Sequence, residues 1–178
     1  DHDEFVPLPR RVRVAQAARA DLFVSVHVNS SPDPSGHGAE VYFVSLTRAT
    51  DVAAQALADK ENAADLIGGP STAAKESILA SEDLLGILLD MTQSETIARS
   101  SDLAESVVGG LRARGGIPVR GVKQAGFQVL RSVVVPSVLV EVGFVTNRLE
   151  ARRLRTASYR DRLADGVARG VRAFLTRE

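Results

Sequence analysis

The segment VVVPSVLVEV, residues 133–142, indicates the fold class of this 178-residue chain. It is apolar almost throughout, apart from Pro136 and Ser137, until Glu141 interrupts it. A run of this kind is typical of a strand that is covered on both faces. We therefore predict a buried strand over residues 133–142 that contains one carboxylate, Glu141.

A second strand is predicted at LFVSVHV, residues 22–28, which is rich in β-branched residues. Alternation along a strand separates its side chains into two faces, Leu22, Val24, Val26 and Val28 on one and Phe23, Ser25, His27 and Asn29 on the other. His27 then lies near the carboxyl end of the strand, away from the valines. Because ligands of open α/β sheets bind outside the carboxyl ends of strands, we expect His27 to border a site.

The rest of the chain alternates between helical and strand patterns. Helices are predicted at residues 8–20, 50–67, 94–114 and 158–174, and further strands at residues 39–44 and 126–131. Asn147, with Glu150 three residues later, resembles a capping box, and Gly166 with Gly170 indicates close packing of the last helix against the sheet. Strands interleaved with helices predict an α/β fold with a mixed, partly parallel central sheet flanked by helices, of the phosphorylase/hydrolase-like kind.

The composition excludes several classes of protein. Lys plus Arg and Asp plus Glu both number 22, so no net charge draws the chain to nucleic acid or to an anionic membrane. The absence of cysteine excludes disulfides, cysteine-ligated zinc and thiol catalysis. No apolar run approaches the roughly 18 residues of a membrane-spanning helix. We expect one domain, residues 1–178, with no membrane span and no nucleic-acid partner.

Glu141 and His27 are the residues whose positions point most directly to chemistry. An unpaired buried carboxylate is costly, so Glu141 should be protonated, paired or bound to a metal, and burial raises a carboxyl pKa toward that of a general base. A neutral imidazole at a strand end suits zinc. The alternatives are a core histidine bonded to a neighbouring loop and a strand-end glutamate paired with an arginine. His2, beside the start of the chain, and His37, in a Pro/Ser/Gly turn, are weaker candidates.

Four stretches carry a resemblance to a known family: ADLFVSVHVN at residues 20–29, PSVLVEVGFVTN at 136–147, NAADLIGG at 62–69 and QAGFQVL at 124–130. The first two are similar to the zinc-ligand strand and the catalytic-glutamate strand of the Amidase_3 family of N-acetylmuramoyl-L-alanine amidases. The other two resemble the cell-division branch of that family. The resemblance extends over nearly the whole chain.

The resemblance implies a zinc hydrolase that cuts the amide between N-acetylmuramic acid and L-alanine in peptidoglycan, for cell-wall remodelling and the separation of daughter cells. His27 corresponds to a zinc ligand. Glu141 corresponds to the catalytic glutamate, which takes a proton from the attacking water and returns it to the leaving amine. Zn²⁺ would lower the pKa of that water and polarise the scissile carbonyl. The family branch also implies a periplasmic protein of a Gram-negative-type bacterium, although the sequence contains no signal peptide.

The start of the chain departs from the family pattern. The family's zinc site also uses the histidine of a His-Gly-Gly motif and a glutamate soon after it, both upstream of the matched stretches, and neither motif occurs here. A catalytic zinc normally has three protein ligands. We therefore expect an N-terminally truncated domain that lacks its first strand or strands, binds zinc weakly and does not cleave peptidoglycan by itself.

Residues 46–117 are expected to form a helical, regulatory insertion. In the cell-division branch, a helix at this place is thought to cover the zinc cleft until an activator protein of the divisome removes it. An acidic residue on that helix could take the open zinc position, and the candidates are Glu61, Glu82 and Asp83. The alternative for each is an ordinary charged helix face.

A second class of function also fits the sequence, namely a non-catalytic peptidoglycan-binding or regulatory module with an amidase-like fold. A serine hydrolase is disfavoured, because the chain contains no Gly-x-Ser-x-Gly motif.

Overall fold

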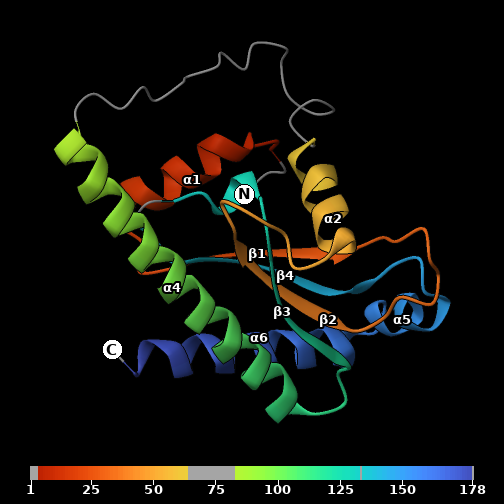
Figure 1. Ribbon diagram of the computed structural model, residues 1–178. Coiled ribbons are helices and arrows are strands. Elements are labelled where there is room, and N and C mark those ends of the chain that lie inside the picture. Colours follow the sequence, from red (N-terminus) through yellow and green to blue (C-terminus); the bar gives the residue numbers. More distant parts are fainter. Residues whose placement is uncertain (1–3, 64–82, 133, 178) are drawn as a thin grey trace.

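The computed structural model describes residues 4–63, 83–132 and 134–177 (Figure 1). In chain order its elements are α1 (Leu8–Ala17), β1 (Phe23–Asn29), β2 (Ala39–Val44), α2 (Val52–Asn62), α4 (Asp83–Arg114), β3 (Val119–Ala125), the 3-10 turn η1 (Gln128–Leu130), β4 (Ser137–Phe144), α5 (Arg148–Leu154) and α6 (Ala157–Leu175).

The four strands form one sheet in the order β1-β4-β2-β3. β1 pairs with β4 and β2 pairs with β3 in parallel, whereas β2 and β4 are antiparallel. This confirms the predicted α/β fold with a mixed, partly parallel sheet. All eight residues of β4 are buried, which confirms the prediction of a strand covered on both faces.

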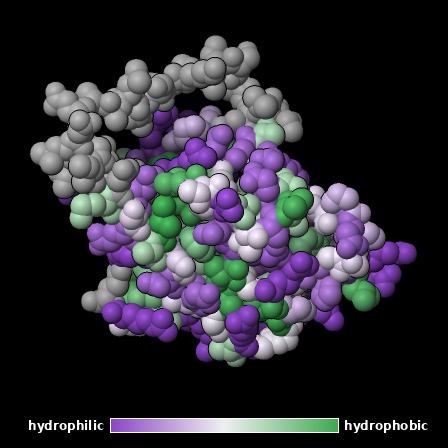
Figure 2. All heavy atoms as spheres, in the orientation of Figure 1, coloured by the Kyte–Doolittle hydropathy of each residue, from purple (hydrophilic) through white to green (hydrophobic). Residues whose placement is uncertain are grey.

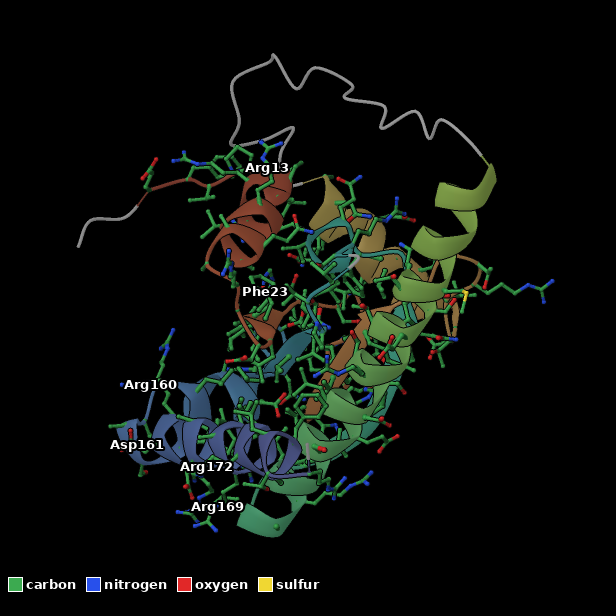
Figure 3. All side chains as sticks on the ribbon, turned by 90° about the vertical axis from the view of Figure 1, so that its left-hand side faces the viewer. Arg13, Phe23, Arg160, Asp161, Arg169 and Arg172 are labelled. Atoms are coloured by element: carbon green, nitrogen blue, oxygen red, sulfur yellow. The ribbon has the colours of Figure 1, made fainter. Side chains whose placement is uncertain are left out.

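Helices cover both faces of the sheet (Figure 1). On one face α1, α2 and η1 enclose a core that contains Leu8, Leu57, Leu130 and Leu139. On the other face α4 and α6 enclose a core whose fully buried members include Leu103, Val107, Leu111, Val138 and Val140. The outer side of α6 is charged, and Figure 3 shows its Arg160, Asp161, Arg169 and Arg172 pointing away from the sheet.

Helices α4 and α6 approach each other through glycines. A Cβ added to Gly170 would lie 2.4 Å from Val107 Cα, and one added to Gly166 would lie 2.9 Å from Leu111 Cδ2. The expectation that Gly166 and Gly170 pack against the sheet is wrong, because their neighbour is α4. The four-residue spacing of the two glycines predicts a closely packed helix face, but it does not identify the element that packs against that face.

The strand predicted at residues 126–131 is also wrong. The strand is β3, which ends at Ala125, and η1 follows it, with Leu130 N–H donating to Phe127 O and Arg131 N–H to Gln128 O. Phe127, Val129 and Leu130 are buried in the core beneath α1 and α2. Their apolar character thus reflects a buried turn rather than a strand.

Strand β4 begins at Ser137, later than the predicted start at residue 133. Ser132 Oγ accepts hydrogen bonds from the N–H groups of Val134 and Val135, which holds the chain in a turn there. Pro136 has no N–H group to donate to a neighbouring strand. The pairing with β1 consequently starts at Ser137, opposite Phe23.

The apolar face of β1 is only half covered, because β1 lies at the edge of the sheet. Leu22 and Val24 pack against the α4/α6 core, whereas Val26 and Val28 are exposed.

On the face drawn in Figure 2, apolar side chains reach the surface in groups separated by polar ones. Among the described residues, no helix combines the length and apolar character that crossing a membrane requires.

Candidate metal centre

His27 and Glu141 lie side by side in the sheet. They are register partners in the parallel strands β1 and β4, so their side chains leave the same face at the same level. Helix α2 brings a third group, and Glu61 Oε2 lies 2.9 Å from His27 Nδ1. One ligand atom from each of the three residues lies within 4.8 Å of those of the other two. The fold thus brings together both predicted site residues and one of the three candidate acids.

Helix α2 is fastened at both ends, and this fixes the position of Glu61. At its start Asp51 caps the helix by accepting from Ala54 N–H at 2.7 Å, and Lys123 Nζ lies 3.1 Å from the other Asp51 oxygen. At its end Asn62 donates to Gly126 O at 2.9 Å and accepts from Gln128 N–H at 2.8 Å. The predicted helix over residues 50–67 is described to residue 63, and its predicted end lies outside the described residues.

His27 and Glu61 form a mutually stabilised ion pair. The hydrogen bond that His27 Nδ1 donates to the Glu61 carboxylate raises the pKa of His27 above its ordinary value and outweighs the opposing effect of burial. The same bond holds the pKa of Glu61 below its usual range. Both shifts favour a protonated imidazole facing a carboxylate.

Glu141 is a buried carboxylate in an unusual environment. Its side chain is 0% exposed, and neither carboxylate oxygen has a hydrogen-bond partner in the described part of the chain. Burial, the largest cause, raises its pKa to about 7, although the nearby His27 opposes the shift. A carboxyl group with a pKa near neutrality can both accept and release a proton at physiological pH.

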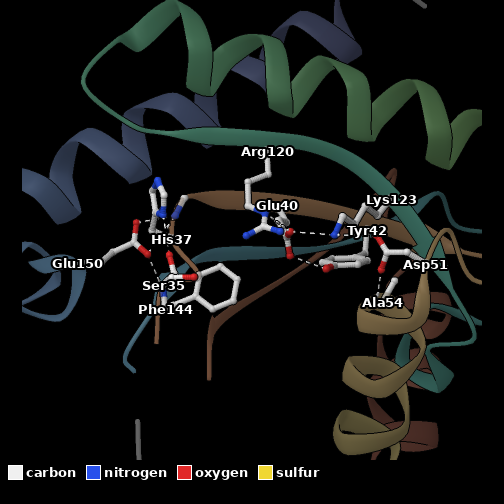
Figure 4. A network of polar contacts seen from close by, with 11 residues as sticks. Ser35, His37, Glu40, Tyr42, Asp51, Ala54, Arg120, Lys123, Phe144 and Glu150 are labelled. Carbon is white, nitrogen blue, oxygen red and sulfur yellow. Dashed lines mark hydrogen bonds and ion pairs between the residues drawn. The ribbon is translucent and has the colours of Figure 1, made fainter. Parts of the chain in front are cut away.

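A polar network continues the site on the other side of Glu141 (Figure 4). Glu40 of β2 is the register partner of Glu141 and is buried. It accepts from Tyr42 Oη at 2.5 Å, and Arg120 Nε and Lys123 Nζ lie 2.6 and 3.0 Å from its Oε1 atom. Glu40 is not among the site residues predicted from the sequence. The sequence does contain a sign of its importance, because Glu40 interrupts the apolar strand AEVYFV in the same way that Glu141 interrupts its own strand.

Glu150 braces the end of β4. Asn147 caps α5 as predicted, accepting from the N–H groups of Leu149 and Glu150. The second half of a capping box is wrong, because the buried Glu150 carboxylate accepts from Gly38 N–H at 2.8 Å and from Phe144 N–H at 2.7 Å. It thereby ties the start of β2 to the end of β4, the two strands that carry Glu40 and Glu141.

The remaining candidates lie apart from this cluster. His37 is exposed in the loop after β1, where its Nδ1 lies 2.9 Å from Ser35 O, in keeping with the predicted turn. His2 and Glu82 lie outside the described residues, as does the side chain of Asp83.

The cluster suits a cation. One imidazole and two carboxylates are donors that zinc accepts, and a buried carboxylate without a hydrogen-bond donor is a group that a positive charge would stabilise. Because His27 and Glu141 come from neighbouring strands, their separation is set by the sheet itself.

The chain matches the Amidase_3 family, described as N-acetylmuramoyl-L-alanine amidase, over residues 1–173. It is 37% identical to the amidase AmiC of Escherichia coli O6:H1 and 36% identical to AmiA of Escherichia coli K12, over 98% and 97% of its own length. It spans only 40% and 58% of these two relatives.

A solved structure agrees. The amidase AmiC2 of Nostoc punctiforme is 27% identical and superposes with a TM-score of 0.62, covering 99% of this chain and 69% of the other. With its sheet, its His27 and Glu141 strands and this sequence match taken together, the chain belongs to the Amidase_3 family of N-acetylmuramoyl-L-alanine amidases.

Proposed function

We propose that the protein hydrolyses the amide bond between N-acetylmuramic acid and L-alanine in peptidoglycan, in a zinc-dependent reaction. The observation that carries the proposal is the buried Glu141 carboxylate, unpaired in the described part of the chain and directly beside His27, in a chain of the amidase family. Such a group has no structural partner to explain it, whereas a base beside a metal ligand accounts for its burial and its raised pKa.

His27 would hold the metal. When bound, Zn²⁺ would polarise the scissile carbonyl and make the attacking water more acidic. Glu141 takes a proton from that water and delivers one to the nitrogen of the leaving L-alanine. In the metal-free chain burial raises the pKa of Glu141 to about 7, and a group that is neither permanently charged nor permanently protonated near neutral pH can make both transfers.

Glu61 is best explained as an inhibitory acid. Its carboxylate engages the Nδ1 atom of His27, and α2 is clamped so that this contact is held in place. We propose that Glu61 occupies a position that substrate or water needs, and that an activator protein of the divisome displaces α2. The same proposal places the protein in the periplasm, where its peptidoglycan substrate lies, and gives it a role in daughter-cell separation.

The 178-residue chain alone should bind zinc weakly. Because the proposal makes Glu61 an inhibitory acid and Glu141 the base, His27 is the one functional metal ligand left among the described residues, whereas a catalytic zinc normally has three protein ligands. Calorimetric titration with zinc checks this expectation, and sub-micromolar binding with turnover would contradict it.

The proposed activity is tested with the full-length parent protein and purified peptidoglycan sacculi. We expect new L-alanine amino termini and soluble stem peptides, loss of both after chelation, and recovery with zinc. Glu141→Gln should lower turnover by about 10²-fold or more, the scale of a lost general base, while Glu105→Gln, an exposed acid on α4, leaves it unchanged. Sacculus binding without new amino termini would instead support a non-catalytic peptidoglycan-binding module.

The inhibitory role is tested separately, by the basal rate of the full-length protein without activator. Glu61→Ala should raise this rate, whereas Asp59→Asn, an exposed acid on the same helix, should not. A fall in the rate of Glu61→Ala would show that Glu61 is a required ligand and not an inhibitor.

A further inference from the structure

A bulge in the β2–β3 pair turns Arg120 onto the face of the candidate metal centre. Ala39 pairs with Val119 and Glu40 pairs with Gly121, so Arg120 is the extra residue of β3. Gly121 has a φ of +116°, a conformation that residues with a Cβ rarely adopt. Bulges are frequent beside active sites, where they redirect a side chain. Here the bulge directs Arg120 toward Glu40 (Figure 4).

The guanidinium of Arg120 is held in a fixed orientation. Its Nε atom lies 2.6 Å from Glu40 Oε1, and its Cζ atom lies 5.7 Å from the centre of the Phe144 ring. Glu40 is itself the register partner of Glu141. The position of the guanidinium relative to the proposed base is therefore set by two neighbouring strands.

Arg120 is not required to neutralise Glu40. Lys123 Nζ contacts the same Glu40 oxygen at 3.0 Å, and Tyr42 donates to the other. Lys123 is mostly buried, whereas the Arg120 side chain is 44% exposed. With 44% of its side chain exposed, Arg120 presents part of its planar fork to solvent at the rim of the site.

An oriented guanidinium with an open edge matches a carboxylate, which it can bind through two parallel hydrogen bonds. We propose that Arg120 binds a carboxylate of the stem peptide on the amine side of the scissile amide and is thereby a specificity-determining residue. This inference rests on the proposed function, which supplies the substrate: the peptide carries carboxylates, while the lactyl group has its own carboxyl bound in the amide.

The test compares two synthetic muramoyl peptides, one with free carboxylates and one with the same groups amidated, in the full-length protein. The wild type should prefer the free carboxylates by about 10-fold to 100-fold in KM, the scale of a charged hydrogen-bonded pair. Arg120→Gln and Arg120→Lys should lose most of this preference. We expect KM to rise for the peptide with free carboxylates and to stay unchanged for the amidated peptide. Arg120→Lys retains a cation beside Glu40 and serves as the variant that preserves the fold. Arg172→Gln, on the outer face of α6, is the matched control and should keep the preference.

Equal losses on both peptides, or a preference retained by both Arg120 variants, would overturn the inference and leave Arg120 as a structural ion-pair partner. If the wild type cleaves neither peptide, the proposed function fails instead. Calorimetric affinities for the same two peptides then still decide whether Arg120 discriminates between a carboxylate and an amide.

Discussion

At the scale of single residues, the chemistry of this molecule is concentrated in one row across the sheet. His27, Glu141 and Glu40 are register neighbours on β1, β4 and β2. The two outer members have partners, Glu61 for His27 and Arg120 with Lys123 for Glu40. The central Glu141 carboxylate has none in the described part of the chain. The row thus isolates one carboxylate in a dry position between two satisfied groups, which is the arrangement that raises a carboxyl pKa.

The His27–Glu61 contact predicts a change in the pKa of His27. In the metal-free chain, Glu61→Gln should lower this pKa, because the hydrogen-bonded carboxylate raises it and the remaining burial lowers it. An NMR titration of the imidazole resonances measures the shift. Asp59→Asn, an exposed acid on the same helix, is the control and should leave the pKa of His27 in place; an unchanged pKa in Glu61→Gln would contradict the ion pair.

Glu141 predicts a pH-dependent stability of the metal-free protein. Its pKa is raised from 4.5 to about 7 in the folded state, so its contribution to stability is fully present below about pH 4.5 and is lost as the pH rises to about 7. Glu141→Gln removes this loss. The free energy of unfolding of Glu141→Gln relative to wild type should therefore increase by roughly 3 kcal/mol between pH 4 and pH 8.

Urea denaturation in the presence of a chelator measures this difference. Glu105→Gln, an exposed acid on α4, should show a flat difference over the same range. A flat difference for Glu141→Gln as well would mean that Glu141 is ionised and well solvated in the folded protein.

At the scale of elements, α2 acts as a cover attached at its two ends. β3 supplies the first attachment, from Lys123 to Asp51 at the start of the helix, and the segment after β3 supplies the second, from Gly126 and Gln128 to Asn62 at its end. Between them Ala54, Leu57 and Ala58 bury the inner face of the helix. A partner protein that displaces α2 must therefore break the contacts of Asn62, which adjoins Glu61.

Asn62→Leu should loosen the end of α2. The substitution removes two hydrogen bonds, one of them partly buried and one exposed, at a cost of about 0.5–1.5 kcal/mol for each bond. Hydrogen exchange should accelerate in the last turn of α2 and in η1. Gln55→Ala, which breaks one exposed bond to Asp59 within the helix, is the control and should change exchange only slightly. Equal exchange in Asn62→Leu and wild type would show that burial alone holds the helix.

At the scale of the whole molecule, the sheet is a fixed platform between two helical layers. The α4/α6 layer contains much of the larger core and carries none of the site residues. The α1/α2 layer carries Glu61 and faces the site. The larger core and the His27–Glu61–Glu141 cluster therefore lie on opposite faces of the same sheet, and β4 is the strand that both layers bury.

The contact between α4 and α6 predicts a pair of opposite stability effects. Gly170→Ala places a Cβ 2.4 Å from Val107 Cα and 2.5 Å from Ser106 O, so it should destabilise the protein by about 1–3 kcal/mol or more. Gly109→Ala meets no atom within 4 Å and should stabilise α4 by about 0.5–1 kcal/mol. Thermal unfolding measures both. A neutral Gly170→Ala variant would mean that the two helices separate easily.

Much of this architecture follows from local pattern. The apolar run around Val138 predicts β4, and the alternation around Val24 predicts β1. Both predictions succeed because burial of one or both faces of a strand appears directly in the pattern of consecutive residues. The strand predicted at residues 126–131 is wrong, because Phe127 and Leu130 are apolar for another reason. They are buried beneath α1 and α2, and the local sequence does not reveal this contact.

Local sequence patterns predict an α/β protein with a carboxylate, Glu141, in a buried strand and a histidine, His27, at a strand end. The three-dimensional arrangement shows that these two residues are neighbours, that Glu61 is the acid that meets His27, and that a bulge brings Arg120 to the same face. The physical reason is that periodicity records whether a side chain is buried. Strand order, register and helix placement decide what it is buried against.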